Sequence, residues 1–116
     1  MSTFNLSQSS NPASLGFVKP TAGTPKNLVS NYTNLLANFC VQSLSIQALP
    51  SNSGNVYVLD NSTAADKTNG LNIIAILTAG QSIPLNSPGQ GSIQPAQYWI
   101  DADVSGEGVL LVVYGA

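Results

Sequence analysis

The stretch that decides the fold class runs Ser43-Leu44-Ser45-Ile46-Gln47-Ala48. Apolar and polar residues alternate in it with a period of two, which is typical of a β-strand with one buried and one solvent-facing side. The residues that follow at positions 50–54, Pro-Ser-Asn-Ser-Gly, have the composition of a turn. This stretch therefore predicts antiparallel β-structure around a half-buried strand.

Towards the C-terminus, short segments with the composition of strands recur, and turn or loop residues separate them. We expect strands at residues 55–60, 71–77, 83–85, 97–104 and 109–114. The segment 71–77 is nearly continuous in apolar residues, which predicts a strand covered on both faces at the centre of the core. Ser105-Gly106-Glu107-Gly108 supplies glycines for a tight turn and predicts a hairpin between the last two strands.

Towards the N-terminus the pattern is different. Residues 1–25 combine Ser, Asn, Pro, Thr and Gly with isolated apolar residues in no sustained period, which predicts an extended N-terminal arm. Residues 27–39 have apolar residues at helix-like spacing but several poor helix formers, so a strand and a short helical turn both remain open. A chain of 116 residues holds one domain. We therefore predict an all-β protein: the arm (1–25), then a single antiparallel β-sandwich or jelly-roll-like domain (26–116).

The charged fraction of 7% is far below the roughly 25% of ordinary soluble domains. Three scattered lysines and a net charge of -2 provide no basic stripe, so we expect no nucleic-acid partner. No apolar run reaches the roughly 20 residues of a membrane span, and the N-terminus lacks the features of a signal peptide. A surface of neutral polar residues loses less on desolvation than a charged one, which favours protein partners, including a homo-oligomer.

The residues needed for catalysis or metal binding are scarce. There is no histidine, and Cys40 is the single cysteine, so a nucleophile has no base and one chain cannot build a cysteine zinc site. Asp101, Asp103 and Glu107 leave a hydrolase-type carboxylate pair or a weak calcium site open, but the calcium-loop pattern breaks at its twelfth position, Val112. We expect these acids to lie on the solvent face of an edge hairpin. The sequence predicts no enzyme, no cofactor and no metal.

Isolated large apolar residues are the candidates for docking onto a partner. They are Phe4, Leu6, Leu15, Phe17 and Trp99. An aromatic residue in a strand is more often part of a core, but Trp99 next to Tyr98 could also stack on a sugar ring. A carbohydrate- or receptor-binding module of a spike, fibre or adhesin is therefore the alternative function.

Four segments carry a family resemblance. They are Val56-Tyr57-Val58, the turn 78–82 leading into Ile83-Pro84-Leu85, residues 97–103, and residues 105–109. Their succession resembles the small β-sandwich domains of head decoration, or cement, proteins of tailed bacteriophages. The resemblance implies a non-enzymatic virion subunit on the capsid surface that stabilises the head by binding major capsid proteins, often as a trimer and sometimes through an N-terminal arm. It specifies strands and turns, and no individual binding residue.

Overall fold

The computed structural model describes residues 12–30, 40–86 and 93–115. Nine elements lie within these ranges: β1 Pro12–Val18, β2 Lys26–Asn27, β3 Ser43–Ala48, β4 Val56–Leu59, β5 Ile73–Leu77, β6 Ser82–Asn86, the 3-10 turn η1 Pro95–Gln97, β7 Trp99–Ala102 and β8 Val109–Tyr114. Within the described ranges, no helix has the length and hydrophobicity to cross a membrane.

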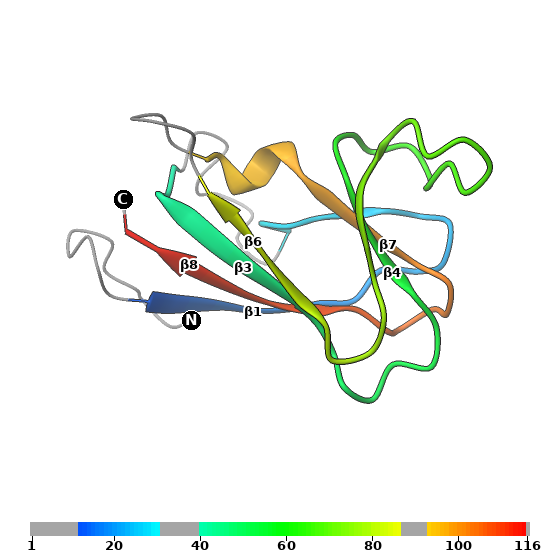
Figure 1. The fold of residues 1–116 in the computed structure, drawn as a ribbon, viewed down its shortest axis with the longest axis horizontal. Coiled ribbons are helices and arrows are strands. Elements are labelled where there is room, and N and C mark those ends of the chain that lie inside the picture. The colour runs from blue at the N-terminus through cyan, green and yellow to red at the C-terminus, as the bar shows by residue number, and fades with distance from the viewer. Residues whose placement is uncertain (1–11, 31–39, 87–92, 116) are drawn as a thin grey trace.

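The strands form two antiparallel four-stranded sheets (Figure 1). The first sheet has the order β1-β8-β3-β6, and the second sheet has the order β2-β7-β4-β5. The chain can be described as one long antiparallel hairpin that is rolled up. Its successive strand pairs lie alternately in the first and the second sheet: β1–β8, β2–β7, β3–β6 and β4–β5. This is the jelly-roll arrangement, so the predicted all-β sandwich is confirmed.

The core lies between the two sheets and is formed by every second residue of the central strands. Leu44, Ile46 and Ala48 of β3 are each at most 1% exposed, as the alternation in that segment predicts. They pack in one cluster with inward-facing residues of the other central strands: Val56, Val58, Ile100, Ala102, Val109, Leu111 and Val113. The predicted strand at residues 55–60 and the short strand at 83–85 are also confirmed, as β4 and β6.

The N-terminal region differs from the prediction. Residues 12–18, expected to belong to an arm, form β1 and pair with β8 along their whole length, whereas residues 1–11 lie outside the described residues. The alternation in β1 is interrupted by a bulge between Ser14 and Gly16, where Gly16 has a φ of 83°. The bulge places two residues three positions apart, Leu15 and Val18, in the core. A period of two could not be recognised there because the extra residue breaks it.

The segment 71–77 also differs from the prediction. Its strand, β5, is an edge strand paired on one side with β4, and it is not the centre of the core. Leu71, Ile74 and Ile76 are 81%, 43% and 54% exposed. Its apolar character suggested burial on both faces, but the face that carries Ile74 and Ile76 stays largely open to solvent.

The predicted C-terminal hairpin is wrong, because β7 belongs to the second sheet and β8 to the first. Residues 103–108 instead cross from one sheet to the other. Gly106 has the positive φ expected of a turn, 84°. Gly108 is needed for a different reason: a Cβ there would lie 1.9 Å from the carbonyl oxygen of Val18. Of the ambiguous segment 27–39, Asn27 ends β2, residues 28–30 form a turn, and residues 31–39 lie outside the described ranges.

Candidate functional site

The outward-facing side chains of the first sheet form a surface that we call the open face. The strand register aligns them in three rows: Phe17–Leu110–Gln47–Ser82, Ser14–Val112–Ser45–Pro84 and Pro12–Tyr114–Ser43–Asn86. The half of each row on β1 and β8 is mainly apolar, and the half on β3 and β6 carries mostly hydroxyl and amide groups. The open face therefore offers apolar contact area beside neutral hydrogen-bonding groups.

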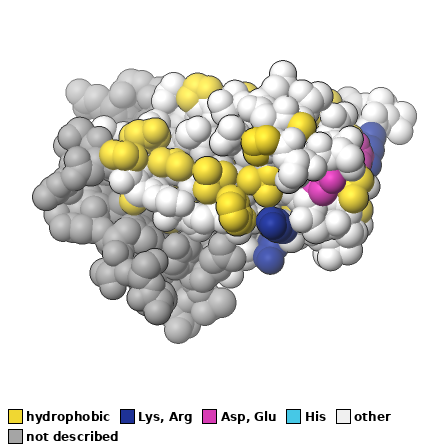
Figure 2. All heavy atoms as spheres, turned by 90° about the horizontal axis from the view of Figure 1, so that it is seen from below, with side chains coloured by type: hydrophobic (Ala, Val, Ile, Leu, Met, Phe, Trp, Pro, Cys, Tyr) yellow, Lys and Arg dark blue, Asp and Glu magenta, His cyan; other side chains and the backbone are white. Residues whose placement is uncertain are grey.

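Apolar groups on the open face are accessible to solvent. Phe17 is 54% exposed, Tyr114 is 38% exposed, and Leu110 and Val112 are half-buried. Figure 2 shows the side of the molecule along β1, where hydrophobic side chains form a row with lysine side chains next to it. The Nζ atom of Lys19 lies 5.2 Å from the centre of the Phe17 ring. The lysine thus marks the border of the open face, since it follows β1 and is not part of the sheet.

Charge is absent from the first sheet. None of the chain's three lysines and five acids lies in β1, β3, β6 or β8. A partner that covers the open face therefore buries no ionised side chain of these strands, which removes the largest desolvation cost of an interface.

The predicted docking residues are distributed over different parts of the fold. Phe17 lies exposed on the open face. Leu15 is 2% exposed in the core, so it is unavailable to a partner, and Phe4 and Leu6 lie outside the described residues. Trp99 is half-buried on the second sheet, where it pairs with Asn27 and Leu59.

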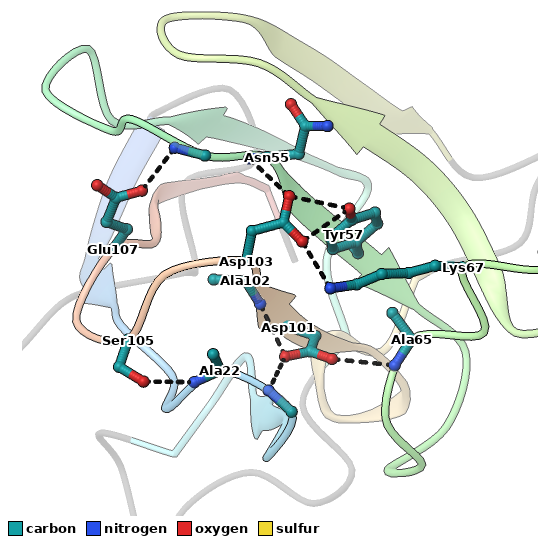
Figure 3. Close-up of polar contacts among 12 residues, drawn as sticks. Ala22, Asn55, Tyr57, Ala65, Lys67, Asp101, Ala102, Asp103, Ser105 and Glu107 are labelled. Atoms are coloured by element: carbon teal, nitrogen blue, oxygen red, sulfur yellow. Dashed lines mark hydrogen bonds and ion pairs between the residues drawn. The ribbon is translucent and has the colours of Figure 1, made fainter.

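The outer side of the second sheet, which we call the covered face, is built in the opposite way. Tyr57, Leu59 and Asp101 are at most 6% exposed although none of them belongs to the core cluster between the sheets. The connections at residues 19–25 and 60–72 are attached to this side by hydrogen bonds (Figure 3). These connections exclude water from the part of the covered face on β4 and β7, whereas Ile74 and Ile76 of β5 on the same side stay exposed.

Asp101 is the central acceptor of the covered face. One carboxylate oxygen accepts the N–H groups of Gly23 and Ala102 at 2.9 and 2.8 Å, and the other accepts the N–H of Ala65 at 2.9 Å. The side chain is 1% exposed, and its two oxygens take the place of water as acceptors for three backbone N–H groups from three segments of the chain. The expectation of a solvent-facing aspartate at a sheet edge is wrong here, because β7 lies between β2 and β4.

Asp103 joins a second group of contacts. Its carboxylate accepts the hydroxyl of Tyr57 at 3.0 Å, the N–H of Asn55 at 3.3 Å and the ammonium of Lys67 at 2.6 Å (Figure 3). The Lys67 ammonium holds the pKa of the Asp103 carboxyl below its ordinary value, and the same contact raises the pKa of Lys67. Burial, and then the hydrogen bond to Asp103, raises the pKa of Tyr57. These contacts attach residue 67 of the 60–72 connection to β4 and to the end of β7.

Glu107 fastens a third connection. Its carboxylate accepts the N–H groups of Ser53 at 2.8 Å and Gly54 at 3.0 Å, and the hydroxyl of Ser53 at 2.9 Å. These donors, with the Gly54 N–H first, lower the pKa of Glu107. Gly54 is required at its position, because a Cβ there would lie 2.9 Å from the Cβ of Asp103.

This arrangement assigns the three acids a structural role. Asp101, Asp103 and Glu107 accept hydrogen bonds from different donors, and most of those donors are backbone N–H groups, which would repel a metal cation. Across residues 12–30, 40–86 and 93–115, no three cysteine or acidic side chains are grouped so that they could hold a metal ion. The chemistry that this geometry supports is the fixing of loops.

Tyr98 and Trp99 do not form one aromatic platform. Tyr98 packs against the core cluster and lines a hollow of about 360 Å³ together with Gln94 and Gln97. Trp99 pairs with Leu59, which lies on the covered face, and the next residue, Ile100, points into the core. The two rings therefore lie on different sides of the chain.

Sequence reasoning missed the apolar part of the open face on β8. Leu110, Val112 and Tyr114 alternate with the buried residues of the same strand, but a run of apolar residues conceals which of them face outward. The signal that could have identified them is the absence of charge throughout residues 109–114. Comparisons of the chain with protein-family models, with curated proteins and with solved structures find no match.

Proposed function

We propose that this protein is a non-enzymatic structural subunit of a virion, a capsid decoration or cement protein that docks on major capsid proteins through its open face. The observation that carries the proposal is the distribution of charge. An uncharged sheet face with exposed Phe17 and Tyr114 is suited to burial against protein, since it combines apolar area with groups that can form new hydrogen bonds.

Two further features support a structural role. The jelly roll is an architecture of viral capsid domains, although it also occurs in lectins, so the fold by itself selects no function. The acids that could have served catalysis are engaged in hydrogen bonds and an ion pair that hold connections of the fold in place. The resemblance to phage decoration proteins points in the same direction and supplies the identity of the partner.

The alternative is a carbohydrate- or receptor-binding module. It draws on Trp99, which is half-buried and so partly accessible. It has less support, because Tyr98 faces a different side and does not extend the stacking surface. A glycan array with wild-type protein and Trp99→Ala tests it: binding that disappears in the variant would favour this alternative over capsid docking.

The main test is binding to particles. The protein should be found in purified virions, and purified protein should co-sediment with capsids stripped of it. Tyr114→Lys on the open face should abolish co-sedimentation, because it buries an unpaired charge. Val104→Lys is the matched control, since Val104 is 41% exposed, close to the 38% of Tyr114, but lies in the β7–β8 connection. Absence of the protein from virions, or equal binding by both variants, would overturn the proposal.

A further inference from the structure

Two of the chain's three lysines lie at one edge of the sandwich. Lys19 follows β1, the edge strand of the first sheet, and Lys26 begins β2, the edge strand of the second sheet. The connection between them folds back on itself, since the N–H of Thr24 donates to the carbonyl of Thr21 at 2.8 Å. The two lysines therefore stand at the two ends of one turn. We call this border, which consists of Lys19 and Lys26, the lysine edge.

The strand register directs the side chain of Lys26 towards the first sheet. Lys26 pairs with Ile100, and residues that pair in antiparallel strands have their side chains on the same face of the sheet. Ile100 lies in the core, so the exposed side chain of Lys26 starts on the inner face of the second sheet. The Nζ atom of Lys19 lies 5.2 Å from the centre of the Phe17 ring. Because stacked sheets are about 10 Å apart, one partner can contact both ammonium groups.

No acid of this chain compensates the two charges. Among the described residues, the one ion pair joins Lys67 to Asp103. All five aspartates and glutamates belong to the described ranges, so none can approach the lysine edge from elsewhere in the chain. The lysine edge is therefore available to carboxylates of another molecule.

The position of Lys19 makes its charge part of the docking surface. A partner that covers Phe17, which is 54% exposed, must approach the ammonium group beside the ring. Such a partner removes water from this group, and a carboxylate that it supplies offsets the loss. Because the strands of the first sheet carry no charge, the lysine edge is the place where charge can orient the partner.

We infer that the capsid surface bound by the open face presents carboxylate groups opposite Lys19 and Lys26. The inference rests on the proposed capsid docking and adds the chemistry of the partner: neutral and apolar over the strands, acidic along the lysine edge. An acidic protein surface fits better than a nucleic acid, since two lysines neutralise few phosphates. Ion pairs at the rim of an interface stay partly hydrated, so they contribute more to the rate and orientation of association than to affinity.

Co-sedimentation of the purified protein with stripped capsids, at salt concentrations from about 0.05 to about 0.5 M, tests this inference. Binding by the wild type should weaken as the salt concentration rises, because salt screens exposed charges. Lys19→Gln and Lys26→Gln should each lower the affinity about threefold in low salt and should reduce its salt dependence. Lys19→Glu should lower the affinity at least about tenfold, since it places like charges opposite each other.

Val104→Glu is the matched control. It changes the net charge of the protein by the same amount as either glutamine variant, but Val104 lies in the β7–β8 connection. It should bind capsids as the wild type does, with the same salt dependence. Amide NMR spectra check that every variant keeps the fold.

Three results would contradict the inference. They are wild-type binding that does not depend on salt, glutamine variants that bind no worse than Val104→Glu, and self-association of the isolated protein in low salt that Lys19→Gln abolishes. The last result would make a second copy the acidic partner.

Capsid docking through the open face is judged separately by Tyr114→Lys. If this variant loses binding while the glutamine variants keep it, docking through the open face stands and the acidic partner surface does not. If the glutamine variants lose binding and Tyr114→Lys keeps it, the acidic partner surface stands and the open face is not the docking surface.

Discussion

The outer face of the first sheet and the outer face of the second sheet differ in how far other parts of the chain cover them. The open face of the first sheet exposes apolar and neutral polar groups. Among the described residues, no carboxylate holds a connection over it. The covered face of the second sheet lies under two connections that Asp101 and Asp103 hold in place. The difference lies in where the few charged residues are. Asp101 and Asp103 attach connections to the second sheet, and the face without charge is left available for contact.

The largest effect should come from removing the central acceptor of the covered face. Asp101→Ala leaves the N–H groups of Gly23, Ala65 and Ala102 without their acceptor in a site that excludes water. We expect the free energy of unfolding to fall by about 2–5 kcal/mol in urea denaturation. Tyr114→Ala on the open face is the comparison, with an expected loss below about 1 kcal/mol. If both variants lost the same free energy of unfolding, the covered face would contribute no more to stability than the open face.

A smaller effect is expected inside the 60–72 connection. Asn72 is 7% exposed; its amide donates to the carbonyls of Thr63 and Ala64, and its oxygen accepts the N–H of Asp66. Asn72→Ala should lower the free energy of unfolding by about 1–3 kcal/mol. Hydrogen exchange should accelerate at the amides of Ala65 and Asp66, while the strands of the first sheet keep their protection. Uniform acceleration in both sheets would show that this connection is not a separate unit.

Acid should weaken the carboxylate contacts and leave the open face unaffected. Asp103 and Glu107 have lowered pKa values in the folded chain, below their ordinary values of 3.8 and 4.5. Their stabilisation is therefore fully present above about pH 5 and is lost as the pH falls through the lowered pKa values. The double variant Asp103→Asn, Glu107→Gln should be less stable at pH 6 and should lose less on acidification. Urea midpoints between pH 6 and 2 measure this, and an unchanged acid dependence would contradict the assignment.

The smallest effect on stability is expected at the middle of the open face. Ser45 lies between Val112 and Pro84 in the central row. Ser45→Lys should change the free energy of unfolding by no more than about 0.5 kcal/mol, because the side chain can extend into water. In contact with a capsid the same lysine would be buried without a partner, so binding should fall at least about tenfold. Normal binding by this folded variant would place the docking surface elsewhere.

Much of the fold could be predicted wherever the local pattern and the final environment agree. β3 alternates between core and solvent, and its polar residues reveal the face that points outward. The turn at residues 50–54 was identified from its Pro, Ser, Asn and Gly residues, and the strand β4 from its short run of β-branched and aromatic residues. β1 was missed because the bulge at Gly16 shifts the apolar period. β5 was misplaced because an apolar run does not reveal whether the strand lies at the edge of its sheet or whether another part of the chain covers its outer face.

The candidate site could be predicted less well. Phe17, selected for its isolation among polar residues, is exposed on the open face, but Leu15, selected for the same reason, is in the core. The role of Asp101 was missed, since its three donors come from residues 23, 65 and 102, and no local pattern connects positions so far apart.

The amino-acid sequence by itself determined the class of the fold, the turn glycines and a surface almost without charge, since these follow from composition and from short-range periodicity. Only the tertiary structure decided which strands meet and which edge stays free. It also decided that the few acids gather around the second sheet, and so which face remains uncharged. The physical reason is that strand order is set by long-range pairing, and the environment of a side chain depends on neighbours from distant parts of the chain.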